Sequence, residues 1–419
     1  MKKTFLFLSI GLCLGTFMAI FAQEESAGIT RPAVKITDHI YKITGDDQFE
    51  VNITISVGPD GILLVDAGTA AIGEKLVNII DSLFDGLVRY IINTHAHNDH
   101  TGGNKYFKDE ATIVAHSNVR ERMSGKYFAL PPLPQDGMPD TTFDSDFTLN
   151  FNGEEIQVKH FPTSHTDNDA VVYFTKSKVA CMGDLLFSDN FPYVDVPGGG
   201  NVDGFYTSVG QVIEWLPEDV VLISGHRRNY NLDELRKYHD MLGTTIDIVR
   251  KQMAKGKSLD EIVQAKVLSE WDAWGTWYII NADNWIRWIF ASLSQTSAPA
   301  IVSICRPLTE TITQKGVEEA AKQYRDLKAN HAAEYNFDEN ELNVLGYQLM
   351  ARDMIDAAIG IFKLNIEAYP ESANTYDSMG EAYMNKGDKE LAIKNYEKSL
   401  ELNPENDNAK WALEKLRGE

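Results

Sequence analysis

The sequence predicts an α/β domain of mixed strands and helices, followed by an α-helical repeat domain. Three observations support this prediction. Short apolar runs typical of buried strands alternate with longer helical patterns from residue 33 to residue 225. The pattern from residue 232 to residue 292 is helical throughout. Beyond residue 310 similar side chains recur every 34 residues, a period typical of stacked helical units.

The first half of the α/β domain is expected to start with strands, after which helices and strands alternate. Residues 33–68 are expected to form strands around a turn at residues 58–61, where Gly-Pro-Asp-Gly is a strong turn signal. A helix is expected at residues 70–84. Strands are expected at residues 88–92 and 111–116, and a short helix follows the second of these.

The second half contains two hairpins, a helix and a strand. A hairpin at residues 147–161 turns at Asn152-Gly153, the strongest short signal for a tight β-turn. A second hairpin is expected at residues 170–182, a helix at 201–215 and a strand at 219–225. Five tryptophans between residues 271 and 288 follow helical spacing, which favours packing between helices over an oligomer contact.

Two loops of this domain are candidates for a substrate mouth. Residues 125–146 and residues 187–200 are long, rich in aromatic or apolar side chains, and punctuated by proline or glycine. Long loops of this kind inside a compact domain are often functional. Packing of each loop against its neighbours is the alternative.

Four side chains of the kind that bind metals lie within six residues. The segment His95-Ala96-His97-Asn98-Asp99-His100 follows directly on the predicted strand at 88–92. Its imidazoles and carboxylate therefore gather around one strand end. Neutral imidazole and carboxylate are ligands that zinc takes, and a catalytic zinc keeps one position open for water. A chance run of polar loop residues is the alternative explanation.

Three further candidate ligands each follow a strand-like run. His165 lies in a polar loop after Phe161, Asp184 follows the run that ends at Met182-Gly183, and His226 follows Ser224-Gly225. Taken singly, each has an ordinary structural explanation, as a loop histidine, a strand-end aspartate or a capping histidine. Their significance lies in the order in which they occur.

In this order the residues resemble the metallo-β-lactamase-fold superfamily, over roughly residues 35 to 295. The resemblance implies an αββα sandwich that carries two metal ions. It implies that His95, His97 and His165 hold the first ion, that Asp99, His100 and His226 hold the second, and that Asp184 bridges them. It also implies that Asp66, at the end of an earlier strand, supports the histidine cluster.

One position departs from the best-known β-lactamases of this fold. Those enzymes have cysteine at the second metal, where this chain has Asp184. The resemblance is therefore closer to the glyoxalase-II-like and lactonase-like branches. A site without thiolate suits two Zn²⁺ ions, and the same donor set also accommodates iron or manganese.

The predicted chemistry is hydrolysis by metal-bound hydroxide. Paired divalent ions ionise water near neutral pH and polarise a carbonyl or phosphoryl oxygen. Asp99 is the candidate catalytic residue, because it can orient the attacking water as well as bind metal. Ser164 is expected to be a turn residue rather than a nucleophile. The expected substrate is a small molecule with a carbonyl-type bond, such as a lactone, a β-lactam or a thioester.

Three other functions stay open on the sequence. The same site could serve a phosphodiester or sulfate-ester hydrolase, or an iron redox enzyme. A different class is a repeat-based protein-interaction module with a secondary metal site. All seven ligand positions are filled, which argues against a site that has lost its function.

Charge and the N-terminal segment limit partners and compartment. The chain has 39 basic and 61 acidic residues and a net charge of −22, which argues against nucleic acid as a partner. Residues 1–22 resemble a secretory signal peptide, with Lys2-Lys3 before an apolar stretch and cleavage expected after Ala22. The mature protein is then periplasmic or secreted, and an uncleaved anchor is the alternative. Cys181 and Cys305 would remain, and we expect two buried thiols rather than a disulfide.

The 34-residue period in the C-terminal part resembles tetratricopeptide repeats. Gly346, Ala358, Phe362 and Pro370 recur as Gly380, Ala392, Tyr396 and Pro404. Residues 316–335 resemble a helix of an earlier repeat, residues 407–417 a capping helix, and residues 296–314 a linker. The expected division is a signal peptide at 1–22, an α/β domain at 23–300 and repeats at 301–419. The resemblance implies a protein partner or self-association through the repeats.

Overall fold

A computed structural model describes residues 32–45, 49–124, 137–275, 277, 280–294, 302–332 and 335–418. The predicted signal peptide and residues 125–136 of the first candidate mouth loop lie outside these residues. Within the described part of the chain, no helix combines the length and apolar character needed to span a membrane.

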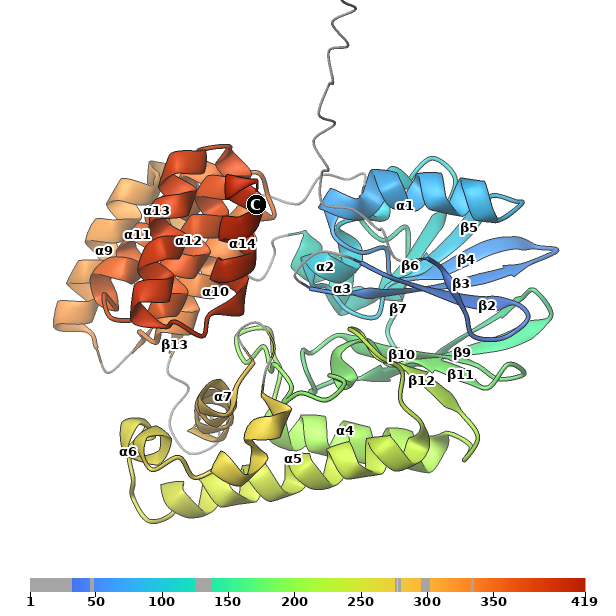
Figure 1. Cartoon of the computed structure of the whole chain (residues 1–419), viewed down its shortest axis with the longest axis horizontal. Coiled ribbons are helices and arrows are strands. Elements are labelled where there is room, and N and C mark those ends of the chain that lie inside the picture. The colour runs from blue at the N-terminus through green and yellow to red at the C-terminus, as the bar shows by residue number, and fades with distance from the viewer. Residues whose placement is uncertain are drawn as a thin grey trace, which may run out of the picture.

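Two sheets pack face to face (Figure 1). The first contains, in spatial order, β1 (Val34–Lys35), β2 (Ile40–Thr44), β3 (Asn52–Gly58), β4 (Gly61–Val65), β5 (Val88–Ile92), β6 (Thr112–His116) and β7 (Thr141–Phe143). Strands β1 to β4 are antiparallel, and β4 to β7 are parallel. The second contains β8 (Phe147–Phe151), β9 (Glu154–Phe161), β10 (Asp169–Phe174), β11 (Val179–Cys181) and β12 (Val221–Ile223).

The second sheet is antiparallel except where β11 and β12 run parallel at its edge. Its first hairpin turns at Asn152 and Gly153, with φ of 54° and 71°. Two consecutive left-handed residues define the tight turn that the Asn-Gly pair predicted. Both predicted hairpins are therefore confirmed.

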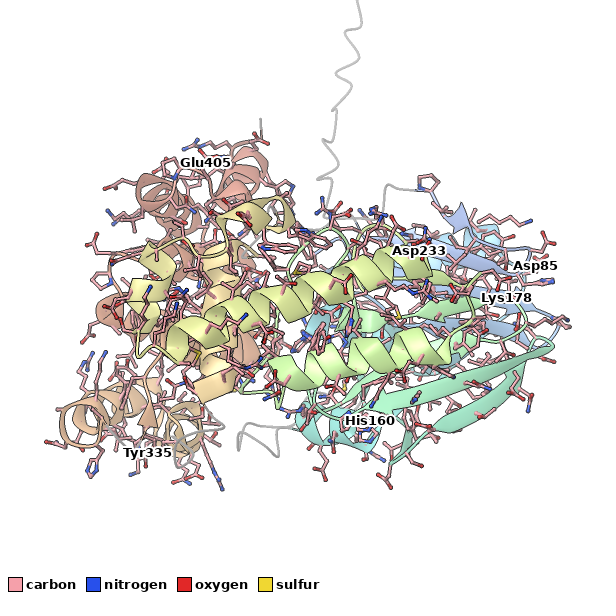
Figure 2. All side chains as sticks on the ribbon, turned by 90° about the horizontal axis from the view of Figure 1, so that it is seen from below. Asp85, His160, Lys178, Asp233, Tyr335 and Glu405 are labelled. Atoms are coloured by element: carbon pink, nitrogen blue, oxygen red, sulfur yellow. The ribbon has the colours of Figure 1, made fainter. Side chains whose placement is uncertain are left out.

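Helices cover the outer faces of the sandwich. Helices α1 (Ala70–Leu83), α2 (Asn98–Thr101) and α3 (Ser117–Met123) lie on the first sheet, and α4 (Val202–Trp215) and α5 (Leu232–Met253) cover the second (Figure 1). Figure 2 shows α4 and α5 side by side along that face. Strand β4 is buried on both sides, with Leu63 and Val65 between the sheets and Ile62 and Leu64 in the core that includes α1. The predicted αββα sandwich is confirmed.

A helical extension follows the sandwich. It consists of α6 (Leu259–Gln264), a 3₁₀ turn η4 (Ser269–Trp274) and α7 (Ala282–Ser294). Trp285 and Trp288 are buried in the core shared with α4 and α5, and the other three tryptophans of the group pack against it. The prediction that this tryptophan group packs between helices is confirmed.

The C-terminal part is a stack of helices with its own core. It contains β13 (Val302–Ser303), α8 (Cys305–Lys315), α9 (Val317–Asn330), β14 (Tyr335–Asn336), α10 (Glu339–Met350), α11 (Ile355–Ala368), α12 (Ala373–Lys386), α13 (Lys389–Leu402) and α14 (Asp407–Arg417). The recurring glycines lie where paired helices cross. A Cβ on Gly346 would come within 2.3 Å of the Phe362 ring, and one on Gly380 within 3.0 Å of the Tyr396 ring.

The predicted linker at 296–314 is wrong over most of its length. Residues 305–315 form α8, and Cys305, Leu308 and Ile312 are buried in the core of the repeats. Pro307 lies in the first turn of this helix, where the missing N–H of proline has no helical partner to bond. Cys305 and Cys181 are both buried free thiols, as expected.

The two halves have separate cores, which predicts that the first can fold alone. One hydrophobic cluster contains only residues from 304 onward, and the others contain only residues up to 293. A chain that ends at residue 296 is therefore expected to unfold cooperatively and to keep its metal content. Calorimetry and elemental analysis check this. The weak bond from Arg352 Nη2 to the Arg122 carbonyl, at 3.4 Å, would be lost. A well-folded truncation without metal would contradict the expectation.

Candidate metal centre

The structure brings all seven predicted ligands to one edge of the sandwich. His95 follows β5, and His97, Asp99 and His100 lie at or in α2. The other three, His165, Asp184 and His226, follow β9, β11 and β12. His95, His97, His165 and Asp184 form one group whose ligand atoms all lie within 4.8 Å of one another. Asp99, His100 and His226 form a second such group.

Asp184 lies between the two groups. Its Oδ1 is 3.2 Å from His100 Nε2 and 3.1 Å from His226 Nε2. Its Oδ2 is 3.5 Å from His165 Nε2 and 3.8 Å from His95 Nε2. Oδ2 also lies 3.3 Å from His226 Nε2. The Asp184 carboxylate is therefore within reach of ligand nitrogens of both groups, as a bridging ligand must be.

Two glycines allow the Asp184 segment to approach its neighbours. Gly183 has φ of +50°, and a Cβ there would lie 2.7 Å from the Thr94 side chain. A Cβ on Gly225 would lie 2.1 Å from Asp184 Oδ1. A side chain would collide with its neighbours at either position. At Gly183 the left-handed backbone disfavours a side chain as well.

Backbone carbonyls fix the protonation of two histidines. His165 Nδ1 is 2.9 Å from the Tyr193 carbonyl oxygen, and His226 Nδ1 is 2.6 Å from that of Phe49. A carbonyl oxygen only accepts hydrogen bonds, so each Nδ1 carries the proton. In the neutral ring, Nε2 then presents a lone pair to the site.

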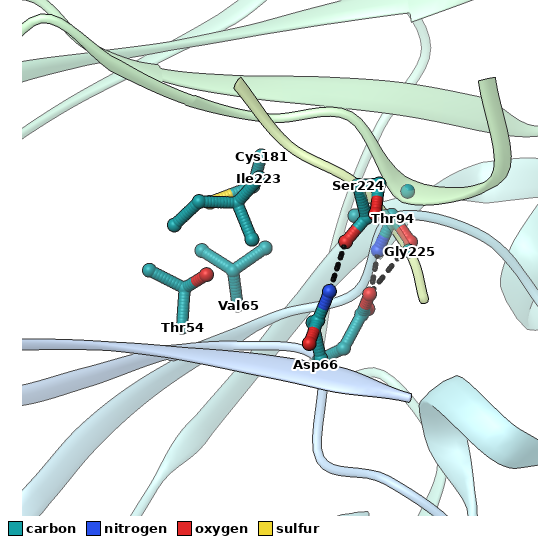
Figure 3. Close-up of a pocket in the computed structure, with 10 residues that line it drawn as sticks. Thr54, Val65, Asp66, Thr94, Cys181, Ile223, Ser224 and Gly225 are labelled. Carbon is teal, nitrogen blue, oxygen red and sulfur yellow. Dashed lines mark hydrogen bonds between the residues drawn. The ribbon is translucent and has the colours of Figure 1, made fainter. Parts of the chain in front are cut away.

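Acidic and hydroxyl groups fix the protonation of the other three histidines of the site. His97 Nε2 donates to Asp195 Oδ2 at 3.1 Å, and His100 Nδ1 donates to Asp66 Oδ2 at 2.8 Å. Thr94 donates its hydroxyl to Asp66, so its oxygen is free to accept from His95 Nδ1 at 3.1 Å. Figure 3 shows Asp66 bonded to Thr94 beside the small cavity behind the site.

Lone pairs consequently face one another inside the site. His97 Nδ1 and His165 Nε2 are 2.9 Å apart, and both present a lone pair when the two rings are neutral. His95 Nε2, His100 Nε2 and Asp184 Oδ1 are buried without a hydrogen-bond partner among the described residues. Converging acceptors repel one another unless a proton or a metal cation lies between them. The donor set therefore fits divalent metal ions.

The ionisation of the cluster also favours a cation. Burial would raise the pKa of Asp184, but His226 and His100 opposite it hold that pKa well below its usual range. Burial would lower the pKa of His100, but Asp184, Asp99 and Asp66 hold it well above its usual value. The pKa of His165, in contrast, is lowered to about 4, mainly by burial. Without metal, the carboxylates thus retain protons on part of the histidine cluster.

Metal affinity is therefore expected to rise with pH. The pKa values of His97, His100 and His226 are raised despite their burial, by Asp195 for the first and by Asp184 for the other two. Protons on these rings compete with metal, and binding releases them. Zinc competition against a chromophoric chelator between about pH 6 and pH 9 should show tighter binding at higher pH. Affinity that does not change over this range would contradict the expectation.

The metal-free protein should respond to pH in the opposite sense. A histidine whose pKa is raised in the folded state contributes stability below its unfolded pKa, near 6.5. That contribution is lost as the pH rises through the folded-state value. Chelated protein should accordingly melt at a lower temperature at about pH 9 than at about pH 6.5, as measured by calorimetry.

Asp99 and Ser164 occupy different environments. Asp99 Oδ2 lies 3.6 Å from His100 Nε2 and 3.7 Å from His226 Nε2, and its side chain is 17% exposed. It can therefore reach both the second group and an incoming molecule. Ser164 is buried and donates to Ser208 Oγ at 2.6 Å, which agrees with a structural rather than a nucleophilic role.

Several residues of the site were not identified from the sequence. Asp195 and the carbonyl groups of Phe49 and Tyr193 orient ligands, yet nothing in the local sequence marks them. Tyr193 does lie in the candidate mouth loop 187–200, and its ring is 5.5 Å from that of His165. Trp277 was expected only to pack between helices, but its ring is also 5.0 Å from that of His226.

The comparisons with known proteins agree with this site. The profile of the Metallo-beta-lactamase superfamily matches residues 46–226, and that of the Tetratricopeptide repeat matches residues 374–406. An uncharacterized protein of Aquifex aeolicus is 28% identical over 194 residues, 44% of this chain and 87% of its own length. The Metallo-beta-lactamase type 2 of Elizabethkingia meningoseptica is 26% identical over 237 residues, 54% of this chain and 87% of its own length.

A solved structure, the metallo-beta-lactamase from Pontibacter korlensis, aligns at a TM-score of 0.44 and 19% identity. The alignment covers 50% of this chain and 98% of that one. The assignment rests instead on the sequence profiles and on the His/Asp cluster. Residues 46–226 form a metallo-β-lactamase superfamily domain with a metal-binding His/Asp cluster, and a tetratricopeptide repeat follows in the C-terminal helices.

Proposed function

We propose that the protein is an exported dinuclear zinc hydrolase that cleaves a carbonyl-type bond, of the lactone, β-lactam or thioester class. The observation that carries this proposal is the convergence of buried acceptor atoms from seven side chains, with Asp184 between the two groups. Seven donors exceed the four that a single tetrahedral zinc ion takes, which supports two ions.

The roles of the residues follow from their positions. His95, His97 and His165 would hold the first ion, Asp99, His100 and His226 the second, and Asp184 both. Bound divalent ions supply a Lewis acid for the substrate oxygen and lower the pKa of water towards about 7. Asp99 orients the attacking water and accepts a proton at its carboxylate, because it is the partly exposed acid of the cluster.

A carbonyl-type substrate is favoured by the aromatic surroundings of the site. Tyr193 and Trp277, both partly exposed, lie beside ligand histidines. Burial and the nearby Asp195 raise the pKa of Tyr193 well above its usual value, so its phenol stays neutral. An apolar wall suits a substrate with a hydrophobic body better than a bare polyphosphate. The relative named Metallo-beta-lactamase type 2 supports including β-lactams in this class.

Export is proposed from the composition of residues 1–22, and a protein partner or self-association from the repeats. The signal segment would place the mature chain in the periplasm or outside the cell. Mass determination of the mature protein tests cleavage after Ala22. Light scattering over a concentration series tests self-association.

The experiment for the activity combines metal analysis with a substrate panel. Protein purified without chelator is expected to hold about two metal ions per chain, mostly zinc, because the donors suffice for two. It should hydrolyse at least one of a lactone, a β-lactam or a thioester. A fully loaded protein with one ion would reject the dinuclear site. Turnover confined to phosphodiesters or sulfate esters would reject the carbonyl assignment and keep the metal centre.

A further inference from the structure

The Trp277 side chain lies against His226, a member of the second ligand group. Its ring centroid is 5.0 Å from that of His226, with 51° between the planes. Phe187 also stacks on His226, at 5.7 Å and 23°, but Phe187 is buried. Trp277 is half-buried, so part of its surface is accessible to a ligand. It belongs to the helical extension, beyond the residues that the superfamily profile matches.

Arg227 lies on the same edge, directly after the ligand His226. Its backbone is held in place, because its carbonyl oxygen accepts bonds from Lys42 Nζ at 2.7 Å and from Asn52 Nδ2 at 2.9 Å. Its φ of 63° is left-handed, a conformation that side chains seldom adopt and that this bonding maintains. The guanidinium carbon lies 5.8 Å from the centre of the Trp277 ring.

Part of the Arg227 guanidinium is available to donate further hydrogen bonds. Its Nε forms an ion pair with Glu50 Oε2 at 3.1 Å, and the side chain is 38% exposed. Its two terminal NH₂ groups form no hydrogen bond with any described residue. Glu50 therefore positions the group and balances its charge, while a planar edge with two donors stays available.

We infer that Arg227 and Trp277 form a substrate-recognition surface for an amphiphilic carboxylate. The carboxylate binds the free edge of the Arg227 guanidinium, and the flat apolar part of the same molecule packs on Trp277. A guanidinium pairs with a carboxylate through two parallel bonds. A single negative charge is favoured over a polyanion because Glu50 already offsets the Arg227 charge. This inference names the substrate class of the hydrolase proposed above and rests on that proposal.

The test is a binding measurement that does not depend on turnover. Calorimetric titration of the metal-loaded full-length protein would compare 2-naphthylacetate with its neutral amide, 2-naphthylacetamide. Arg227→Gln is expected to weaken carboxylate binding by about tenfold or more, because hydrogen bonds to charged groups are the stronger ones. It should leave amide binding within about twofold. Trp277→Ala should weaken both probes, and Trp277→Phe should restore most of the loss.

Arg236→Gln is the matched control. Arg236 is also 38% exposed and paired with acids, Glu218 and Asp233, on the outer helix α5. This variant should bind both probes as the unmodified protein does. Metal content is measured for every variant, so that a change in binding is not mistaken for metal loss.

Two results would overturn the inference. One is an Arg227→Gln variant that keeps the preference of the unmodified protein for the carboxylate over the amide. The other is an unmodified protein that shows no such preference. If the carboxylate binds as expected but no ester, lactam or thioester is hydrolysed, the proposed function fails and the recognition surface stands.

Discussion

Replacing Asp184 by asparagine is expected to cause the largest loss of activity of any single substitution in this protein. The amide keeps the shape of the side chain but turns one of the two oxygens that face the ligand groups into NH₂. Loss of a group behind a metal ligand costs about 10–100-fold, so loss of the carboxylate between the two groups should cost more than about 100-fold in kcat/KM. Metal content should fall from about two ions per chain.

Asp85→Asn is the control for this substitution. Asp85 is exposed and lies at the end of the sandwich away from the repeats (Figure 2). The control should keep the metal content and the turnover of the unmodified protein. Turnover close to normal in a metal-depleted Asp184→Asn protein would rule out a mechanism that depends on this carboxylate.

Replacing Asp66 by alanine is expected to have the second-largest effect, although Asp66 is not itself a predicted ligand. Its Oδ1 accepts the Thr94 N–H at 2.8 Å, and its Oδ2 accepts from both the Thr94 hydroxyl and His100 Nδ1 at 2.8 Å. Without it, His100 and, through Thr94, His95 lose the partners that fix their protonation. Metal affinity should fall by about 10–100-fold, as measured by chelator competition.

The substitution also leaves buried donors unpaired, which costs about 1–3 kcal/mol each. Asp353→Ala is the matched control, because Asp353 shares the left-handed backbone, with φ of 57° against 61° for Asp66, but is exposed between α10 and α11. This control separates the effect of placing alanine at a left-handed backbone position from the effect of removing the Asp66 carboxylate from the site. Equal metal affinity in the two variants would show that Asp66 does not support the ligands.

The sequence by itself determined most of the elements and the seven candidate ligands. Buried strands carry continuous apolar runs. The polar residues at their ends, such as His95 and Asp184, meet at one edge because β5 and β11, in different sheets, both end there. The capping helix at 407–417 and the glycines 346 and 380 were predictable because each repeat packs its helices in the same way. Because these signals are local or periodic, they can be recognised in a single sequence.

Only the tertiary structure decided how the candidate site is completed. Asp195 bonds to His97 across 98 residues, the Phe49 carbonyl to His226 across 177, and no local pattern encodes either contact. Trp277 had helical spacing, which predicts packing but not that its ring lies beside His226. The α8 segment resembled a linker because it has few apolar residues, and these are buried only when α8 packs against α9 and α10. Local periodicity specifies which face of an element is buried, whereas the partner that buries it is set by the assembled fold.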